Sequence, residues 1–237
     1  SRTHKLGILF EALVEWSVIK GLGYTCLGKD VQIRSPERTL GALDLVLKAP
    51  NGQIEHWELA YKLFLQVEPG AMWNHWIGPG GRDRLDIKVR RILDHQLPLS
   101  SRPEADSALR SLGVEQIDRH RVLLQGALFA PWANPQEPTL QGVAPPKGRW
   151  LHASKFDTII ADRPNSMWTQ RSKPDWFGPW FRPDDSAISI TRLATELKTR
   201  PLVGPQLWVC RDSNMNQVSE PVFLVPDGWG RKTEKRK

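Results

Sequence analysis

Two acidic residues, Asp44 and Glu58, lie in stretches whose residue pattern predicts neighbouring β-strands. Residues 40–48 alternate between leucines and smaller or polar side chains, and residues 54–65 alternate between large apolar and polar side chains. Both acids fall on the face that lacks the large apolar residues. Carboxylates on adjacent strands are suitable ligands for a hard divalent cation, so the chemistry depends on whether the fold brings these two together.

The turn between the two stretches decides whether Asp44 meets Glu58. In a two-residue turn over Asn51 and Gly52, positions that sum to 103 would pair, and the two acids would face away from each other. A three-residue loop suits the sequence better, because Pro50 presets the backbone of a type I turn and Gly52 accepts the left-handed conformation of a bulge. Positions that sum to 102 then pair, which predicts that Asp44 lies directly opposite Glu58.

The predicted pairing of two carboxylates is a local conflict in an otherwise well-patterned hairpin. Like charges directly opposite in a sheet destabilise it by several tenths of a kcal/mol. Ala42 and Ala60 pair beside the acids and leave space next to them. Two explanations stay open: either a cation lies between Asp44 and Glu58, or one of the carboxylates bonds a nearby arginine or a helix N-terminus.

An amphipathic helix is expected ahead of these strands, over residues 5–20. Its predicted buried stripe consists of Leu6, Phe10, Leu13 and Ser17, with Leu9 and Trp16 alongside. Glu11 and Glu15 lie one turn apart on another face, where they repel each other unless a positive group lies between them. They are either two solvated glutamates or part of a charged site.

A basic stripe marks a second predicted helix, over residues 82–97. Arg84, Lys88 and Arg91 recur at helical spacing, and three aspartates in the same stretch offset their charge. The stripe is therefore either a solvated, salt-bridged face or a surface that follows a phosphate backbone. Further strands are expected over residues 24–33 and 121–129.

Tryptophan and proline are frequent in the C-terminal half. We expect a helix over residues 188–198 and short strands over residues 206–211 and 220–225. Three tryptophans among prolines and glycines are expected to fill the core rather than to stack on nucleic-acid bases: Trp168, Trp176 and Trp180. The expected domains are residues 1–132 as the main core, 133–230 as an extension packed on it, and 231–237 as a basic tail.

Composition and charge are typical of an ordinary soluble globular chain. Of 237 residues, 40% are hydrophobic and 25% are charged, and no stretch approaches the roughly 20 apolar residues of a membrane helix. The tail 231–237 carries +4 of the net charge of +7, so the remainder is only mildly basic. With two cysteines and no visible leader peptide, the expected location is the cytoplasm.

The expected order of a helix, three strands, a helix and a strand resembles the core of the PD-(D/E)XK nuclease superfamily, the restriction-endonuclease-like fold. The motifs that carry the resemblance are Gly7-(x)3-Glu11, Leu40 to Asp44, His56 to Lys62 and Gly80 to Lys88. They are similar to those of a family of uncharacterised bacterial proteins assigned to that superfamily, over residues 5–130. The resemblance implies an α/β fold with a mixed central sheet flanked by helices, followed by a Trp- and Pro-rich extension.

Residue by residue, the resemblance assigns metal binding to Asp44 and Glu58, with Glu11 in support, and catalytic assistance to Lys62. The implied cofactor is Mg²⁺ (or Mn²⁺), held by the carboxylates, a backbone carbonyl and waters. The ion would neutralise charge at a scissile phosphate and lower the pKa of an attacking water, which the lysine would orient. The stripe of Arg84, Lys88 and Arg91 would then contact the nucleic-acid backbone.

The lysine departs from the superfamily pattern. There it lies two residues after the second acid, where this chain has Ala60, and Lys62 lies about 6.6 Å further along the same face. Two functions stay open: a metal-dependent nuclease that hydrolyses phosphodiester bonds of DNA or RNA, and a catalytically inactive module of this fold that binds nucleic acid or a protein partner. A homodimer also stays open, and no membrane partner is expected.

Overall fold

A computed structural model of the chain describes residues 6–70, 72–133, 145–178, 186–212 and 220–230. The chain forms two compact units: unit 1 comprises residues 1–62 and 87–125, and unit 2 comprises residues 63–86 and 126–237. Strands β3 (Ile54–Gln66) and β5 (Arg119–Pro131) have residues in both units. Because these units are groupings by contact, the domain boundary expected after residue 132 stays a prediction.

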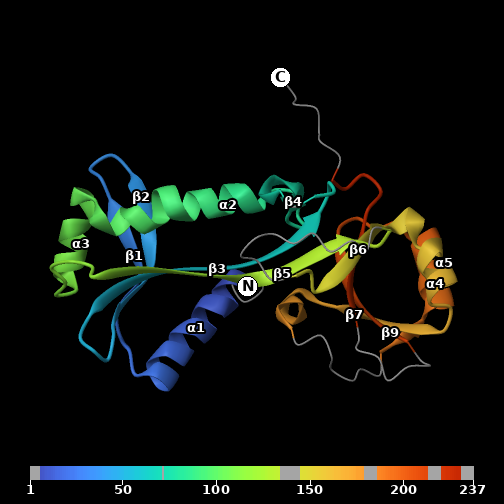
Figure 1. Ribbon diagram of the computed structural model, residues 1–237, viewed down its shortest axis with the longest axis horizontal. Coiled ribbons are helices and arrows are strands. Elements are labelled where there is room, and N and C mark those ends of the chain that lie inside the picture. Colours follow the sequence, from blue (N-terminus) through green and yellow to red (C-terminus); the bar gives the residue numbers. More distant parts are fainter. Residues whose placement is uncertain (1–5, 71, 134–144, 179–185, 213–219, 231–237) are drawn as a thin grey trace. The chain divides into compact units, whose positions relative to one another are not determined.

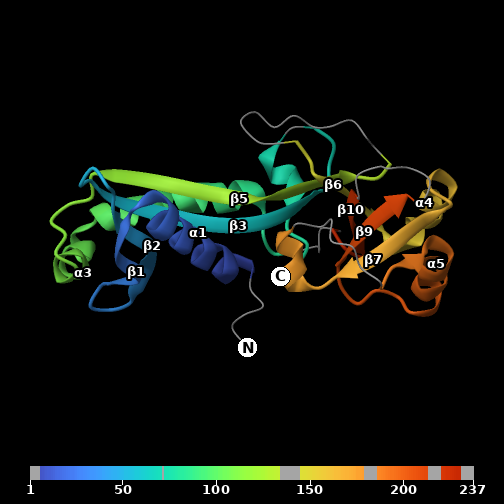
Figure 2. The ribbon, with the colours of Figure 1, turned by 90° about the horizontal axis from the view of Figure 1, so that it is seen from below.

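Unit 1 is built from antiparallel strands with helices on both sides. Besides parts of β3 and β5, it contains α1 (Leu6–Leu22), β1 (Thr25–Arg34), β2 (Thr39–Lys48), most of α2 (Leu85–Arg91) and α3 (Asp106–Ser111). The strand order is β1-β2-β3-β5, and the β1–β2 and β2–β3 pairs are antiparallel. Within this unit α1 covers one face of the strands, and α3 lies on the other side (Figures 1 and 2).

The β2–β3 hairpin has the register that a three-residue loop predicts. Leu45 pairs with Trp57, and the paired positions of the two strands sum to 102. The Ala49 N–H donates to the Gln53 carbonyl oxygen at 2.8 Å, and Gly52 adopts a φ of 88°. The three-residue loop and its register are therefore confirmed.

Apolar side chains of β1 and β2 pack with the segment 99–114 to form the core of unit 1. Its buried members are Ile33, Leu43, Val46, Leu99, Ala105, Leu109 and Val114. Leu43 and Leu45, on either side of Asp44, are both almost completely buried. Since burial of apolar surface is the main stabilising term in folding, core packing holds the backbone that carries Asp44 on both sides.

Helix α1 buries a different stripe from the one predicted. Its buried side chains are Phe10, Val14 and Val18, whereas Leu13 is 43% exposed and Trp16 is 65% exposed. Because α1 is apolar on nearly all sides, its periodicity does not distinguish the face that packs on the strands. The predicted stripe is therefore wrong except at Phe10.

The second predicted helix, over residues 82–97, is less regular than expected. Helix α2 ends at Arg91, and it continues as a π-helical turn over Ile92–Gln96 and a 3-10 turn over Leu97–Ser101. A π turn is wider than an α turn, because each N–H bonds the carbonyl five residues back. Side chains after Arg91 therefore leave the pattern of a regular helix, and Leu93 is 53% exposed.

Unit 2 contains a mixed sheet with two helices. Besides parts of β3 and β5, its elements are β4 (Trp76–Ile77), β6 (Gly148–His152), α4 (Asp157–Asp162), β7 (Ser166–Arg171), β8 (Ile188–Ser189), α5 (Ile190–Thr199), β9 (Gln206–Asp212) and β10 (Glu220–Val225). The strand order is β5-β6-β10-β9-β7-β8, and β4 pairs with β3. Strand β6 is parallel to β5 and β10, whereas the pairs β9–β10, β7–β9, β7–β8 and β3–β4 are antiparallel. Figure 1 shows α4 and α5 side by side.

Tryptophans contribute much of the core of unit 2. Trp168 is completely buried, and Trp132 and Trp208 are buried with it. Trp176 packs edge-on against Phe223, with ring centroids 5.0 Å apart. The expected core role is confirmed for Trp168, whereas Trp180 and the basic tail lie outside the described residues. In the part of the chain that the structure describes, no helix is long and apolar enough to span a membrane.

Candidate active site

Asp44 and Glu58 lie beside each other where the regular β2–β3 pairing ends. Asp44 Oδ2 accepts a hydrogen bond from the Leu59 N–H at 2.8 Å, so a carboxylate oxygen takes the place of a backbone acceptor. Burial and, next, the charge of Glu58 raise the pKa of Asp44 from its ordinary 3.8 to about 7, against the effects of the Leu59 N–H and of Lys88. The two acids are therefore close enough for their charges to interact.

Glu58 is 1% exposed, and both of its carboxylate oxygens accept hydrogen bonds. His56 Nε2 lies 2.9 Å from Oε1, and Gln96 Nε2 donates to Oε2 at 2.6 Å. Such donors reduce the cost of burying a carboxylate. Neither bond comes from an arginine or a helix N-terminus, which were the partners that the second explanation of the acid pair required.

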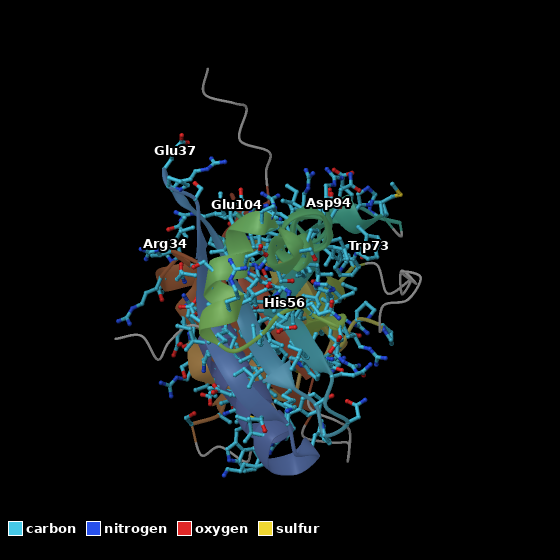
Figure 3. The ribbon with its side chains drawn as sticks, turned by 90° about the vertical axis from the view of Figure 1, so that its left-hand side faces the viewer. Arg34, Glu37, His56, Trp73, Asp94 and Glu104 are labelled. Carbon is cyan, nitrogen blue, oxygen red and sulfur yellow. The ribbon has the colours of Figure 1, made fainter. Side chains whose placement is uncertain are left out.

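A chain of hydrogen bonds leads from Glu58 to the surface of unit 1. His56 Nδ1 lies 3.0 Å from Ser100 Oγ, which lies 2.8 Å from His120 Nε2. His56 is completely buried in the interior of the unit (Figure 3), whereas His120 is exposed. With Glu58 ionised, one arrangement satisfies every group, because each member then donates towards Glu58: His120 to Ser100, Ser100 to His56, and His56 to the carboxylate.

Glu11 on α1 belongs to the same electrostatic environment. Burial is the largest cause that raises the pKa of Glu11; the charge of Glu58 raises it further, and that of Lys29 opposes the rise. The charge of Glu11 in turn acts on Asp44. Glu15, one turn further along α1, forms an ion pair with Lys29. Of the two glutamates on this helix, Glu11 is therefore the one that is coupled to the acid pair.

Lys62 and Lys88 are close enough for their charges to interact. Lys62 on β3 has interactions with other residues of the protein. Lys88 on α2 is half-buried and donates to Gln96 Oε1 at 3.2 Å. Burial and the charge of Lys62 lower the pKa of Lys88, whereas Asp44 and Glu58 raise it. Lys88, predicted on the basic stripe, is thus linked to Glu58 through Gln96.

The other two members of the basic stripe remain at the surface. Arg84 donates twice to the Asp86 carboxylate, at 2.6 and 3.0 Å, and Arg91 is exposed. An ion pair with a neighbouring aspartate reduces the charge that Arg84 offers to a phosphate. Contact of Arg84, Lys88 and Arg91 with a nucleic-acid backbone stays a prediction.

Three polar side chains of this site were not predicted: His56, Gln96 and Ser100. His56 was within reach of the sequence pattern, because residues two apart on a strand share a face and His56 precedes Glu58 by two. Gln96 and Ser100 lie in and after the π-helical turn, where a regular helical pattern assigns the wrong directions. Their positions follow from the irregular end of α2.

Metal binding at this site would depend on the oxygens of the acid pair. Among the described residues, no group of three or more His, Cys, Asp or Glu side chains is arranged to hold a metal ion. Asp44 and Glu58 nevertheless suit a hard cation, because each carboxylate oxygen has two lone pairs and one N–H bond leaves the second available. They would hold Mg²⁺ or Mn²⁺ together with backbone carbonyls and waters.

The structure thus defines a mixed α/β protein with a carboxylate pair, a lysine and a histidine chain gathered in one unit. Residues 1–218 match the family described as Domain of unknown function (DUF1853), and the chain belongs to this family. The description of the family assigns no activity. No curated protein and no solved structure matches the chain.

Proposed function

We propose that this protein is a metal-dependent phosphodiesterase that hydrolyses DNA or RNA, with a restriction-endonuclease-like core formed by α1, β1–β3, α2 and β5. The observation that carries the proposal is the closeness of Asp44 to Glu58, where burial and the neighbouring charge raise the pKa of Asp44 to about 7. An acid kept in such surroundings is destabilised, and perturbed groups of this kind gather at functional sites.

The order of elements in unit 1 supports the fold part of the proposal. A helix, an antiparallel three-strand meander, a helix and a further strand follow one another, with an acid on the first helix and acids on the second and third strands. This is the arrangement that the resemblance to PD-(D/E)XK nucleases implies. The additional helix α3 lies between the second predicted helix and β5.

Hydrolysis of a phosphodiester by this site follows ordinary chemistry. The oxygen of a water bonds to phosphorus, the ester P–O bond breaks, and the leaving oxygen takes up a proton, which gives a phosphate monoester and an alcohol. Bound Mg²⁺ would supply positive charge at the phosphate and acidify the water. In the protein, His56 and Gln96 hold the carboxylate of Glu58 in one orientation, and Glu11 adds negative charge from α1.

Conservative substitutions of the acid pair test the proposal. Wild type, Asp44→Asn and Glu58→Gln are incubated with end-labelled single- and double-stranded DNA and RNA oligonucleotides in Mg²⁺ or Mn²⁺. We expect the wild type to cleave at least one class and each variant to lose about 100-fold or more of the rate. Glu37→Gln is the matched control, because Glu37 is an exposed acid in the β1–β2 turn, away from His56 (Figure 3).

Two results would contradict the phosphodiesterase. Cleavage that persists in the Asp44→Asn, Glu58→Gln double variant would come from another source and would overturn the proposal. Binding without cleavage by the wild type, with an affinity that depends on Arg84 and Arg91 and not on the acids, would support the inactive nucleic-acid-binding module instead.

A further inference from the structure

The side-chain amide of Gln96 joins the acid pair to a lysine. Its Nε2 donates to Glu58 Oε2 at 2.6 Å, and its Oε1 accepts from Lys88 Nζ at 3.2 Å. The two partners fix the orientation of the amide, because an ionised carboxylate only accepts and an ammonium only donates. Glu58, Gln96 and Lys88 therefore form one continuous chain of hydrogen bonds.

The π-helical turn is what brings Gln96 to Lys88. In a regular α-helix the eight steps from Lys88 to Gln96 would turn through about 800°, which leaves the two side chains about 80° apart around the axis. The wider turn over Ile92–Gln96 rotates less per residue and reduces this angle. The irregular end of α2 thus aligns two side chains that a regular helix would separate.

The charge of Lys88 acts directly on the acids of the site. It opposes the rise in the pKa of Asp44 and the rise in the pKa of Glu11. Lys62 acts on Lys88, whose pKa it lowers, and has interactions of its own. Along β3, Lys62 also lies about 6.6 Å beyond the position that the superfamily pattern gives to its lysine. Lys88 is therefore linked to Glu58 through one side-chain amide and is close enough to Asp44 for its charge to act on it.

We propose that Lys88, positioned by Gln96, is the lysine of this site, in the role that the superfamily pattern assigns to a lysine on the third strand. The inference rests on the proposed phosphodiesterase and replaces Lys62 in it. The ammonium of Lys88 stabilises the negative charge that gathers on the phosphoryl oxygens during attack by water. Gln96 acts through Lys88 and Glu58 and is a positioning residue.

Calorimetric titration of the full chain with Mn²⁺ alone tests the position of Lys88 without relying on cleavage. A positive charge beside a cation site weakens binding, so we expect Lys88→Met to bind Mn²⁺ about tenfold more tightly than the wild type. We expect Lys62→Met to change the affinity by less than about threefold. Lys48→Met, at an exposed strand end, is the matched control, and Lys88→Gln serves if the methionine variant does not fold.

Cleavage of the oligonucleotides tests the catalytic part. We expect Lys88→Met to lose about 100-fold of the rate while it binds Mn²⁺ more tightly, a combination that general loss of structure does not produce. Lys88→Arg keeps the positive charge, so its Mn²⁺ affinity should stay near that of the wild type.

The outcomes separate this inference from the function on which it rests. If Lys62→Met binds Mn²⁺ more tightly and loses cleavage, and Lys88→Met does neither, the inference is overturned and the phosphodiesterase stands. If the wild type cleaves nothing but Lys88→Met binds Mn²⁺ more tightly, the phosphodiesterase fails and the place of Lys88 beside the acid pair is supported. Absence of Mn²⁺ binding in every variant would overturn both.

Discussion

Two glutamates on one strand, Glu55 and Glu58, are equally buried and yet have opposite surroundings. On one face of β3, Glu55 accepts two bonds from Arg121, at 2.6 and 3.0 Å, and one from Trp57 Nε1 at 2.7 Å. On the other face, Glu58 is held by an imidazole and an amide and lies beside a second acid, Asp44. Burial alone therefore does not distinguish the two.

The acids on the two faces of β3 differ in how their surroundings change their pKa. Burial raises the pKa of Glu55, but the hydrogen bonds from Arg121 and Trp57 outweigh it, so its pKa lies below the ordinary 4.5. On the opposite face, burial and a neighbouring acid raise the pKa of Asp44 to about 7. An acid whose charge is compensated by hydrogen bonds and an arginine stabilises the fold. An acid whose charge is left uncompensated is a candidate for ligand binding.

Removal of Glu55 should have the largest effect on stability. We expect Glu55→Ala to lower the free energy of unfolding by about 3 kcal/mol, because the hydrogen bonds of Arg121, Trp57 and Tyr24 to a charged group are lost. Urea unfolding followed by tryptophan fluorescence measures the change. Glu104→Ala is the control, since Glu104 is exposed (Figure 3), and it should change stability by less than about 0.5 kcal/mol. A loss below about 1 kcal/mol for Glu55→Ala would remove the distinction between the two faces.

We expect Asp44→Asn to raise the free energy of unfolding, in contrast to Glu55→Ala. The amide can still accept from the Leu59 N–H, and it carries no charge. Between about pH 4 and pH 7 the unfolded chain gives up the Asp44 proton while the folded protein keeps it, since its pKa rises from 3.8 to about 7. The wild type therefore loses stability as pH rises through this window, and the variant avoids that loss.

The gain from Asp44→Asn is smaller than the loss from Glu55→Ala. One pKa unit corresponds to about 1.4 kcal/mol, and solvent screens this half-buried group, so we expect a gain of about 2 kcal/mol at pH 8. The gain should vanish near pH 4, and urea unfolding at several pH values measures it. Asp94→Asn, at an exposed position, is the control. A gain that does not depend on pH would contradict the electrostatic explanation.

Ser100→Ala should have the smallest effect of the three. The change leaves the buried Nδ1 of His56 without a donor and should lower stability by about 1 kcal/mol. Thermal unfolding detects this, with Ser101→Ala as the control, because the neighbouring serine is exposed. A full restoration of stability by Ser100→Thr, which keeps the hydroxyl, would sharpen the assignment to the hydrogen bond. Equal unfolding temperatures for Ser100→Ala and Ser101→Ala would argue against the chain of hydrogen bonds from Glu58 to His120.

Local chemistry made the hairpin and several other elements predictable. The register of β2 and β3 follows from Pro50 and Gly52, which select the loop without help from the rest of the fold. Strand β10 was predicted over its full length, and α5 within two residues at its start. The buried face of α1 could not be predicted, because a helix that is apolar on nearly all sides acquires its orientation only from the strands it packs on.

The candidate site was predictable where it lies on the hairpin and not where it lies on α2. The proximity of Asp44 and Glu58 follows from the hairpin register, which is a local property. The contact between Gln96 and Glu58 depends on a π-helical turn, and no periodic signal in the sequence indicates it. Lys88 precedes this turn, but its link to Glu58 runs through Gln96 and could therefore not be predicted either.

The π-helical turn allows this site to tolerate a change of one residue in the length of a short segment. A wider turn accommodates one residue more than an α turn, so a single deletion within residues 92–96 would restore a regular helix. Gln96 would then lie seven positions from Lys88, and in a regular α-helix the two side chains would be only about 20° apart around the axis. A chain of this family can therefore gain or lose one residue here during evolution while it keeps the Lys88 arrangement.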